Sequence, residues 1–132
     1  MNDALKYLAV SVASLLLFAS PARAQEVPIR WDTAGRFERA LTIAPGGVAE
    51  LCGKLRRGAA VDWRFDADAP LDFNVHYHVG REAVYPVRMA GSATGADKFV
   101  APKDQTYCWM WQNTLALPAA LKAALHLQGK RE

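Results

Sequence analysis

Apolar and polar side chains alternate strictly along one stretch, Leu71-Asp72-Phe73-Asn74-Val75-His76-Tyr77-His78-Val79. Successive side chains of a β-strand point to opposite faces, so one face of this stretch is apolar and the other is polar. The polar face carries two of the three histidines of the chain, His76 and His78. A later stretch, Tyr107-Cys108-Trp109-Met110-Trp111-Gln112-Asn113, alternates in the same way, with its aromatic residues on one face. We expect both stretches to be core strands, with any specific chemistry on the faces that they leave exposed.

Shorter stretches with a strand pattern fill most of the remaining sequence. The lead-in over 25–35 has weak strand character around 29–31. The clearer strands are expected at 36–43, 48–55, 60–67, 83–89 and 98–101, with turn signals such as Pro45-Gly46-Gly47 between them. Pro86 has no N–H to donate, which places 83–89 at a sheet edge or a bulge. Many short strands at close spacing predict a single all-β domain, an antiparallel β-sandwich.

The end of the chain has a different pattern. Pro118 suits the first turn of a helix, and Gly129 suits its stop. One helical face would carry Leu117, Leu121, Ala124, Leu125 and Gln128. The sequence therefore predicts a short C-terminal helix over 117–128 that packs against the sandwich, with His126 on its surface. A dimerisation helix is the alternative.

Residues 1–24 have the features of a secretory signal peptide. Lys6 supplies a positive start, 8–18 is a short apolar run, and Ala22-Arg23-Ala24 is a small-x-small cleavage site. Cleavage after Ala24 would leave one domain over 25–132; an uncleaved membrane anchor is the alternative. No later stretch is long and apolar enough to span a bilayer, so the prediction is a periplasmic or secreted protein.

Two cysteines, Cys52 and Cys108, lie in the part expected to be exported. An even number of cysteines in an oxidising compartment favours a disulfide. The bridge is expected to tie a front strand to a rear one across two stacked sheets. A metal site with thiolate ligands is the alternative.

The order of these features resembles the GOLD domain of the p24 (emp24/gp25L) cargo-receptor family and its lipid-transfer relatives. The resemblance covers about 48–113, and the matching positions are Cys52, Tyr107, Cys108, Trp109 and Asn113. It implies a GOLD-like or jelly-roll-like β-sandwich with a Cys52–Cys108 disulfide. It also implies a binding or interaction module without enzymatic activity.

The histidine pair offers one candidate for chemistry. His76 and His78 are two residues apart on one strand face, and imidazole suits copper, zinc and nickel. Met110 lies on the non-aromatic face of the later strand, so the three side chains could converge if the two strands are neighbours. Such a set predicts a copper-type or zinc site, with the thioether favouring Cu(I). The alternative is that both histidines face solvent or pair with neighbours such as Asp72.

A small ligand could use the same region without a metal. Asp72 and Asn74 share the face of the histidines, and Tyr77 belongs to the aromatic set on the other face. These three residues are the predicted binding residues. The inward aromatic residues are expected in the core, although some could line a pocket between the sheets for an apolar ligand.

No catalytic set assembles in the sequence. Ser92 is the one serine after residue 24, and it has no G-x-S-x-G context. Basic residues are scattered, which argues against a nucleic-acid partner. The prediction is therefore an exported, non-catalytic module that binds an envelope protein or small ligand. The alternative is a periplasmic copper-type metal-binding protein that uses His76 and His78.

Overall fold

The computed structural model describes residues 24–129, which contain strands and loops. None of these residues forms a helix of a length and hydropathy that could cross a membrane. The all-β class predicted from the sequence is confirmed for this part of the chain. Its strands are β1 (Ala24–Pro28), β2 (Arg36–Ile43), β3 (Val48–Leu55), β4 (Ala60–Val79), β5 (Glu82–Val100), β6 (Gln105–Gln112) and β7 (Ala119–Gln128).

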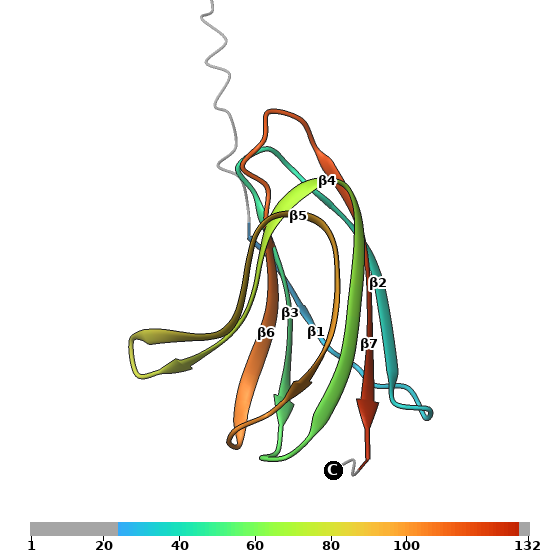
Figure 1. The fold of residues 1–132 in the computed structure, drawn as a ribbon, viewed down its shortest axis with the longest axis vertical. Coiled ribbons are helices and arrows are strands. Elements are labelled where there is room, and N and C mark those ends of the chain that lie inside the picture. The colour runs from blue at the N-terminus through green and yellow to red at the C-terminus, as the bar shows by residue number, and fades with distance from the viewer. Residues whose placement is uncertain (1–23, 130–132) are drawn as a thin grey trace, which may run out of the picture.

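The strands form one mixed sheet that curls into an open half-barrel (Figure 1). The strand order is β1-β3-β6-β4-β7-β2, and β5 pairs with β4. β1 runs parallel to β3, whereas the other pairs are antiparallel. The prediction of two stacked antiparallel sheets is wrong, because the strands form one sheet with a parallel pair and one continuous strand joins its two halves.

That joining strand is β4. Its residues 60–67 pair with β7, and its residues 72–76 pair with β6. The register with β5 shifts between Asp66 and Leu71, where the sequence contains Asp68-Ala69-Pro70. Proline has no N–H for the ladder, so the strand bends at this point and then continues. The strands predicted separately at 60–67 and 71–79 are therefore one bent strand. β5 likewise joins the strands predicted at 83–89 and 98–101, and it ends at Val100.

Aromatic side chains fill the concave side of the curled sheet. The ring of Phe73 lies 4.8 Å from that of Trp63, 4.9 Å from that of Phe65 and 5.2 Å from that of Trp111. Trp63 and Phe65 precede the bend in β4, and Phe73 follows it. Each aromatic contact of this kind stabilises a fold by about 0.5–1.5 kcal/mol beyond area burial, so this cluster holds the two halves together.

Gly95 of β5 lies opposite Phe65 of β4. A Cβ atom at Gly95 would lie only 2.6 Å from Cε1 of Phe65. The Phe65 ring therefore occupies the space that any other side chain would need at this position. A glycine inside a strand marks this kind of close approach.

The helix predicted over 117–128 is wrong, because these residues include strand β7. β7 lies between β2 and β4 and pairs antiparallel with both. Buried and exposed side chains alternate along it, and the buried ones are Ala119, Leu121, Ala123, Leu125 and Leu127. Alanine and leucine favour a helix when isolated, but hydrogen bonds to two neighbouring strands override that preference.

The N-terminal part differs from the prediction in detail. The first strand lies at Ala24–Pro28, where it runs beside β3, and not around 29–31. The predicted signal peptide lies, apart from Ala24, outside the described residues. Asn113, one of the positions matched to the GOLD pattern, is buried and donates hydrogen bonds from Nδ2 to the carbonyl oxygens of Ile43 and Leu117.

Candidate functional site

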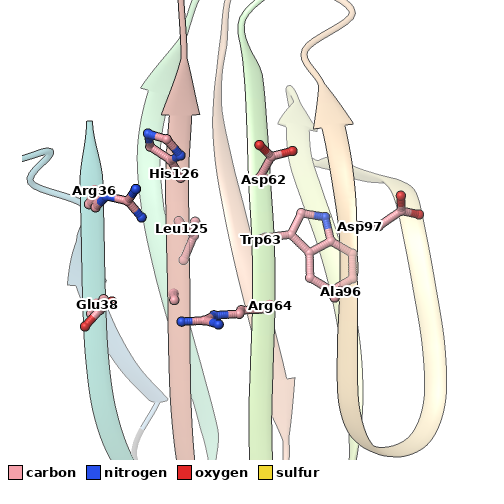
Figure 2. A pocket seen from close by; sticks show the side chains of 10 residues that line it. Arg36, Glu38, Asp62, Trp63, Arg64, Ala96, Asp97, Leu125 and His126 are labelled. Atoms are coloured by element: carbon pink, nitrogen blue, oxygen red, sulfur yellow. The ribbon is translucent and has the colours of Figure 1, made fainter. Parts of the chain in front are cut away.

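One hollow is lined by residues of β2, β7, β4 and β5 (Figure 2). It has a volume of about 470 Å³, and its lining includes the charged side chains of Arg36, Glu38, Asp62 and Arg64. Opposite charges alternate around it, so the hollow has no strong preference for an anion or a cation. His126 lines it from β7, where it is half-buried, and not from a terminal helix as predicted.

A second surface lies on the convex face of the other half, where β3, β6 and β4 are neighbours. Cys108 of β6 pairs with Cys52 of β3 on one side and with His76 of β4 on the other. The core residues Trp109 and Val75 flank this row and point the opposite way. Alternation along each strand thus brings the two predicted disulfide cysteines and the predicted metal ligand His76 together on one face.

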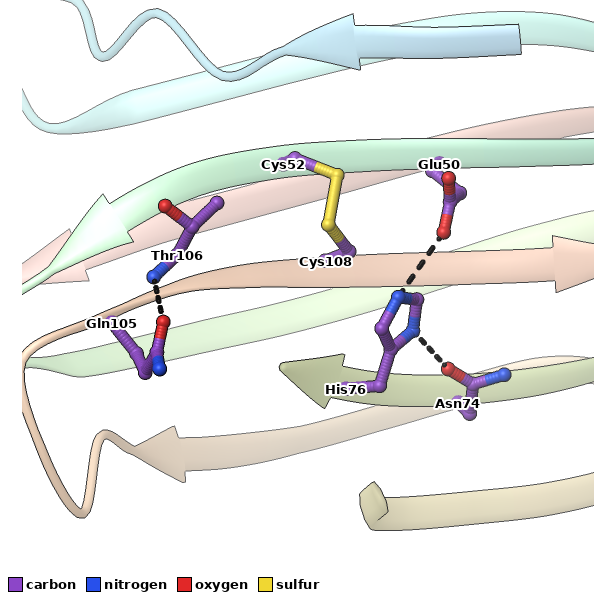
Figure 3. The surroundings of a disulfide bond; sticks show 7 residues. All are labelled: Glu50, Cys52, Asn74, His76, Gln105, Thr106 and Cys108. Atoms are coloured by element: carbon purple, nitrogen blue, oxygen red, sulfur yellow. Dashed lines mark hydrogen bonds and ion pairs between the residues drawn. A yellow bond between two sulfur atoms is a disulfide. The ribbon is translucent and has the colours of Figure 1, made fainter. Parts of the chain in front are cut away.

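The disulfide between Cys52 and Cys108 is confirmed (Figure 3). It joins neighbouring strands of the same sheet, with the Cα atoms 4.1 Å apart. The expectation that the bridge crosses from one stacked sheet to another is wrong. The cysteine count identified the bond, but the strand order that makes β3 and β6 neighbours was needed to place it.

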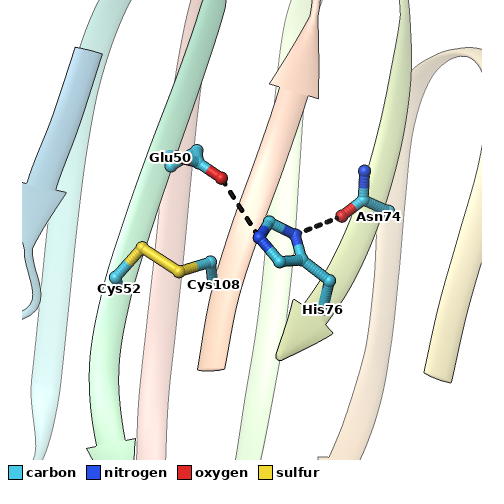
Figure 4. Close-up of polar contacts among 5 residues, drawn as sticks. All are labelled: Glu50, Cys52, Asn74, His76 and Cys108. Carbon is cyan, nitrogen blue, oxygen red and sulfur yellow. Dashed lines mark hydrogen bonds and ion pairs between the residues drawn. A yellow bond between two sulfur atoms is a disulfide. The ribbon is translucent and has the colours of Figure 1, made fainter. Parts of the chain in front are cut away.

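His76 points away from the aromatic core, yet both nitrogens of its ring are held by neighbouring side chains. The residue is only 4% exposed. Its Nε2 lies 3.2 Å from Oε1 of Glu50, and its Nδ1 lies 2.8 Å from Oδ1 of Asn74 (Figure 4). Both ring nitrogens therefore have polar partners, and the orientation of the imidazole is set by two different strands.

The other predicted metal ligands lie around His76. The His78 ring is 5.2 Å from the His76 ring, centroid to centroid, and is exposed. Met110 pairs with Asn74 across β4 and β6, and with Glu50 across β3 and β6. The structure thus places these side chains on one face. Metal binding by His76, His78 and Met110 remains a prediction.

The predicted small-ligand residues have local contacts of their own. Asp72 accepts a hydrogen bond from the backbone N–H of Gly91, and Asn74 contacts His76. Tyr77 is buried, with its ring 5.4 Å from that of Tyr107. Ligand binding by these residues remains a prediction.

The hairpin that follows His76 was expected from the strands predicted at 71–79 and 83–89, but sequence reasoning missed its exposed apolar surface. The ladder between β4 and β6 ends at His76, and beyond it Tyr77–Val79 pair with Glu82–Val84 of β5. Figure 1 shows this hairpin projecting from the sheet. Exposed apolar side chains gather on it: Val79 is 50% exposed, Val84 37% and Tyr85 38%. The Gly80-Arg81 turn itself was predicted; the signal that was not used is the presence of apolar residues on both faces of the next strand.

An arginine side chain stacks on the exposed aromatic ring of the hairpin. The guanidinium carbon of Arg88 lies 4.0 Å from the centroid of the Tyr85 ring. Both residues line a shallow groove of about 340 Å³, together with Asp72, Asn74, Met110 and others. The stacked pair forms a flat surface that is apolar on its ring and positively charged on its guanidinium.

Burial changes the acidity of the Tyr107 hydroxyl. Its hydroxyl donates a hydrogen bond to the carbonyl oxygen of Lys103 at 2.7 Å. Burial raises the pKa of Tyr107 above its ordinary value, because the charged phenolate is poorly solvated there. This tyrosine is part of the buried core.

These observations define a class: an all-β protein whose one curled sheet forms an open half-barrel, with a disulfide on the convex face and a projecting hairpin. Neither a protein-family model nor a curated protein matches the sequence. Solved structures do match. A periplasmic inhibitor of g-type lysozyme, PliG of Aeromonas hydrophila, is 13% identical, with a TM-score of 0.66, and the match covers 80% of this chain and 98% of that one.

PliG of Salmonella Typhimurium, named likewise as a periplasmic inhibitor of g-type lysozyme, is 11% identical, with a TM-score of 0.56 over 79% of this chain and 98% of that one. A mitogen derived from Yersinia pseudotuberculosis is 12% identical, with a TM-score of 0.55 over 74% of this chain and 89% of that one. At these identities the likeness concerns the fold. The prediction that the chain is not an enzyme agrees with these neighbours, which are named as inhibitors and a mitogen.

The resemblance to the GOLD domain is wrong, since the structural matches are to this half-barrel. Its basis was the order of the strands, with an early cysteine at Cys52 and, around the late one, the alternation of Cys108 with Tyr107 and Trp109. In this fold the alternation arises because aromatic residues of β6 face the core while Cys108 faces outward to its neighbour on β3. An in-sheet disulfide next to core aromatic residues produces the same spacing in an unrelated fold.

Proposed function

We propose that this protein is an exported inhibitor of a lysozyme-type glycosidase. The observation that carries the proposal is the fold match that spans 98% of the A. hydrophila lysozyme inhibitor, at a TM-score of 0.66. The disulfide supports an oxidising compartment such as the periplasm. The predicted signal peptide agrees with export.

The projecting hairpin supplies the chemistry that such a role needs. Glycosidases of this type act with a pair of carboxylic acids that flank the scissile bond. An inhibitor that enters the cleft is favoured by cationic groups, which complement the carboxylates, and by aromatic groups. Arg81, Arg88 and Tyr85 provide both on one hairpin, next to the exposed side chains of Val79 and Val84.

The base of the hairpin is held in place before any partner arrives. His76, the last residue of β4 that pairs with β6, lies directly before the hairpin and contacts Glu50 on β3. Gln105 donates a hydrogen bond from Nε2 to the carbonyl oxygen of His78 at 3.0 Å. A preorganised element loses less conformational entropy on binding, which favours high affinity.

The test is inhibition of purified g-type lysozyme, followed as clearing of a bacterial cell suspension, together with binding to immobilised enzyme. We expect one chain to inhibit one enzyme molecule. Tyr85→Ala and Arg88→Ala should each weaken binding about 30-fold, the effect of losing a central interface side chain of about 2 kcal/mol. Arg64→Ala, an arginine removed from the other half of the sheet, is the matched control and should change binding less than threefold.

Two outcomes separate the parts of the proposal. If the unmodified protein neither binds nor inhibits lysozymes of several families, the inhibitor function is wrong. If it inhibits but the Tyr85 and Arg88 variants inhibit equally well, the hairpin is not the contact surface.

A further inference from the structure

Four side chains with metal-binding atoms meet on the convex face at the disulfide. Glu50 and Cys52 come from β3, Cys108 from β6 and His76 from β4 (Figure 4). The ligand atoms of Glu50, His76 and Cys108 all lie within 4.8 Å of one another, and Cys52 is bonded to Cys108. Within residues 24–129 no other group of three histidine, cysteine or acidic side chains converges in this way.

We propose that the disulfide blocks a metal site, which forms when the bond is reduced. In the reduced protein the thiolates of Cys52 and Cys108, Nε2 of His76 and a carboxylate oxygen of Glu50 bind one Zn²⁺ or Cu⁺ ion. In the oxidised protein both sulfur atoms are committed to the bond, so two of the four ligands are absent. Metal affinity is thereby controlled by the redox state of one bond.

The reaction needs a dithiol reductant. One thiolate of the reductant attacks a sulfur of the Cys52–Cys108 bond and forms a mixed disulfide, which its second thiol resolves. The reductant leaves as its own disulfide, and the protein gains two electrons and two protons as two thiols. Metal binding then releases both thiol protons to solvent, and the ion replaces Glu50 as the direct partner of Nε2 of His76.

The ligand types select the ion. Two thiolates, one imidazole and one carboxylate make a four-ligand set that suits tetrahedral Zn²⁺. Thiolate and thioether ligands suit Cu⁺, and Met110 stands between Glu50 and Asn74 in the strand register, where its sulfur could take the place of the carboxylate. A hard cation such as Mg²⁺ is disfavoured by the sulfur ligands.

An independent feature supports His76 as a ligand. A metal-bound histidine almost always donates its second ring N–H to an oxygen, which fixes the tautomer and the ring orientation. Here Nδ1 of His76 already lies 2.8 Å from Oδ1 of Asn74. With Nδ1 held toward Asn74, Nε2 is the ring nitrogen that faces Glu50 and the disulfide. The orientation that a metal site requires is therefore present before reduction.

The experiment is titration of the intact protein with Co²⁺ as a spectroscopic substitute for Zn²⁺, before and after reduction and anaerobic removal of the reductant. The readouts are the cobalt–thiolate charge-transfer absorption and the melting temperature. We expect one equivalent to bind to the reduced protein, with the thiolate band and a raised melting temperature, and no band from the oxidised protein. A His76→Gln variant should bind Co²⁺ at least about tenfold more weakly, and Asn74→Ala about tenfold more weakly. His126→Gln, on the other half of the sheet, is the matched control.

The proposal is overturned if the reduced, folded protein gives no thiolate band, or if His76→Gln binds Co²⁺ as tightly as the unmodified protein. Reduction could also unfold the chain. In that case Co²⁺ must restore the folded circular dichroism spectrum in the unmodified protein but not in Cys52→Ser. If Co²⁺ restores the spectrum in neither protein, the proposal is overturned.

Discussion

Removal of the Cys52–Cys108 disulfide by the paired substitution Cys52→Ala and Cys108→Ala is expected to destabilise the protein strongly. The bond closes a loop across a sequence separation of 56 residues. In the chain-entropy model, freeing a loop of that size raises the entropy of the unfolded chain by about 14 cal/mol/K, or about 4 kcal/mol at 25 °C. A domain of this size has a total stability of about 5–15 kcal/mol, so the loss is a large fraction of it.

Urea unfolding followed by circular dichroism measures this loss. We expect the free energy of unfolding to fall by about 4 kcal/mol and the m-value to rise, because the unfolded chain without the cross-link is more expanded and exposes more surface. Thr106→Ala changes an exposed residue on the same strand and should alter stability by less than about 0.5 kcal/mol.

The disulfide stabilises the protein mainly by restricting the unfolded chain, and the m-value tests this point. A loss below about 1 kcal/mol would refute it. A loss of the expected size with an unchanged m-value would also count against it, because the effect would then come from packing around the two sulfur atoms and not from the loop.

Three further predictions concern single residues. Gly95→Ala should destabilise the fold by about 1–3 kcal/mol in urea unfolding, since the new Cβ would lie 2.6 Å from Phe65. His76→Ala should cost about 1–3 kcal/mol because it leaves polar partners unpaired, whereas His78→Ala should change stability by less than about 0.5 kcal/mol. The raised pKa of Tyr107 favours the folded state while the phenol is protonated, so this contribution is complete below pH 10.0, the ordinary tyrosine pKa, and is lost as pH rises through the folded-state pKa.

Each of these predictions has its own control. Thr94→Ala, next to Gly95 but exposed, should leave unfolding unchanged; an equal loss there would mean that Phe65 is not the cause. Equal effects of the two histidine substitutions would remove the structural role of His76. The alkaline loss of stability should be shallower in Tyr107→Phe, and an identical slope in that variant would assign it to other groups.

The sequence predicted the faces of the strands well and their connections less well. Strict alternation identified the apolar faces of 71–79 and 107–113, and most strand bounds agree with the structure. The bend in β4 was missed because Pro70 normally ends a strand, whereas here the chain continues beyond an irregular register. β7 was missed because its alanine and leucine residues satisfy a helical period as well as an alternating one. The two strands that enclose it decide between the periods, and local sequence does not contain them.

For the candidate sites too, the sequence predicted the face on which each residue lies but not which residues meet. Alternation placed His76, Cys108 and Met110 correctly on outward faces, since that property depends on each strand alone. Which outward side chains meet depends on strand order, and β6 lies between β3 and β4 although it follows both in sequence. This order brings Cys108 between Cys52 and His76, and it brings Glu50 to the histidine. Three of the four ligands proposed for the reduced protein are therefore residues that the sequence had assigned to two separate hypotheses, a thiolate site and a histidine site. The fourth, Glu50, belonged to neither hypothesis, and the topology of the sheet brings it to the other three.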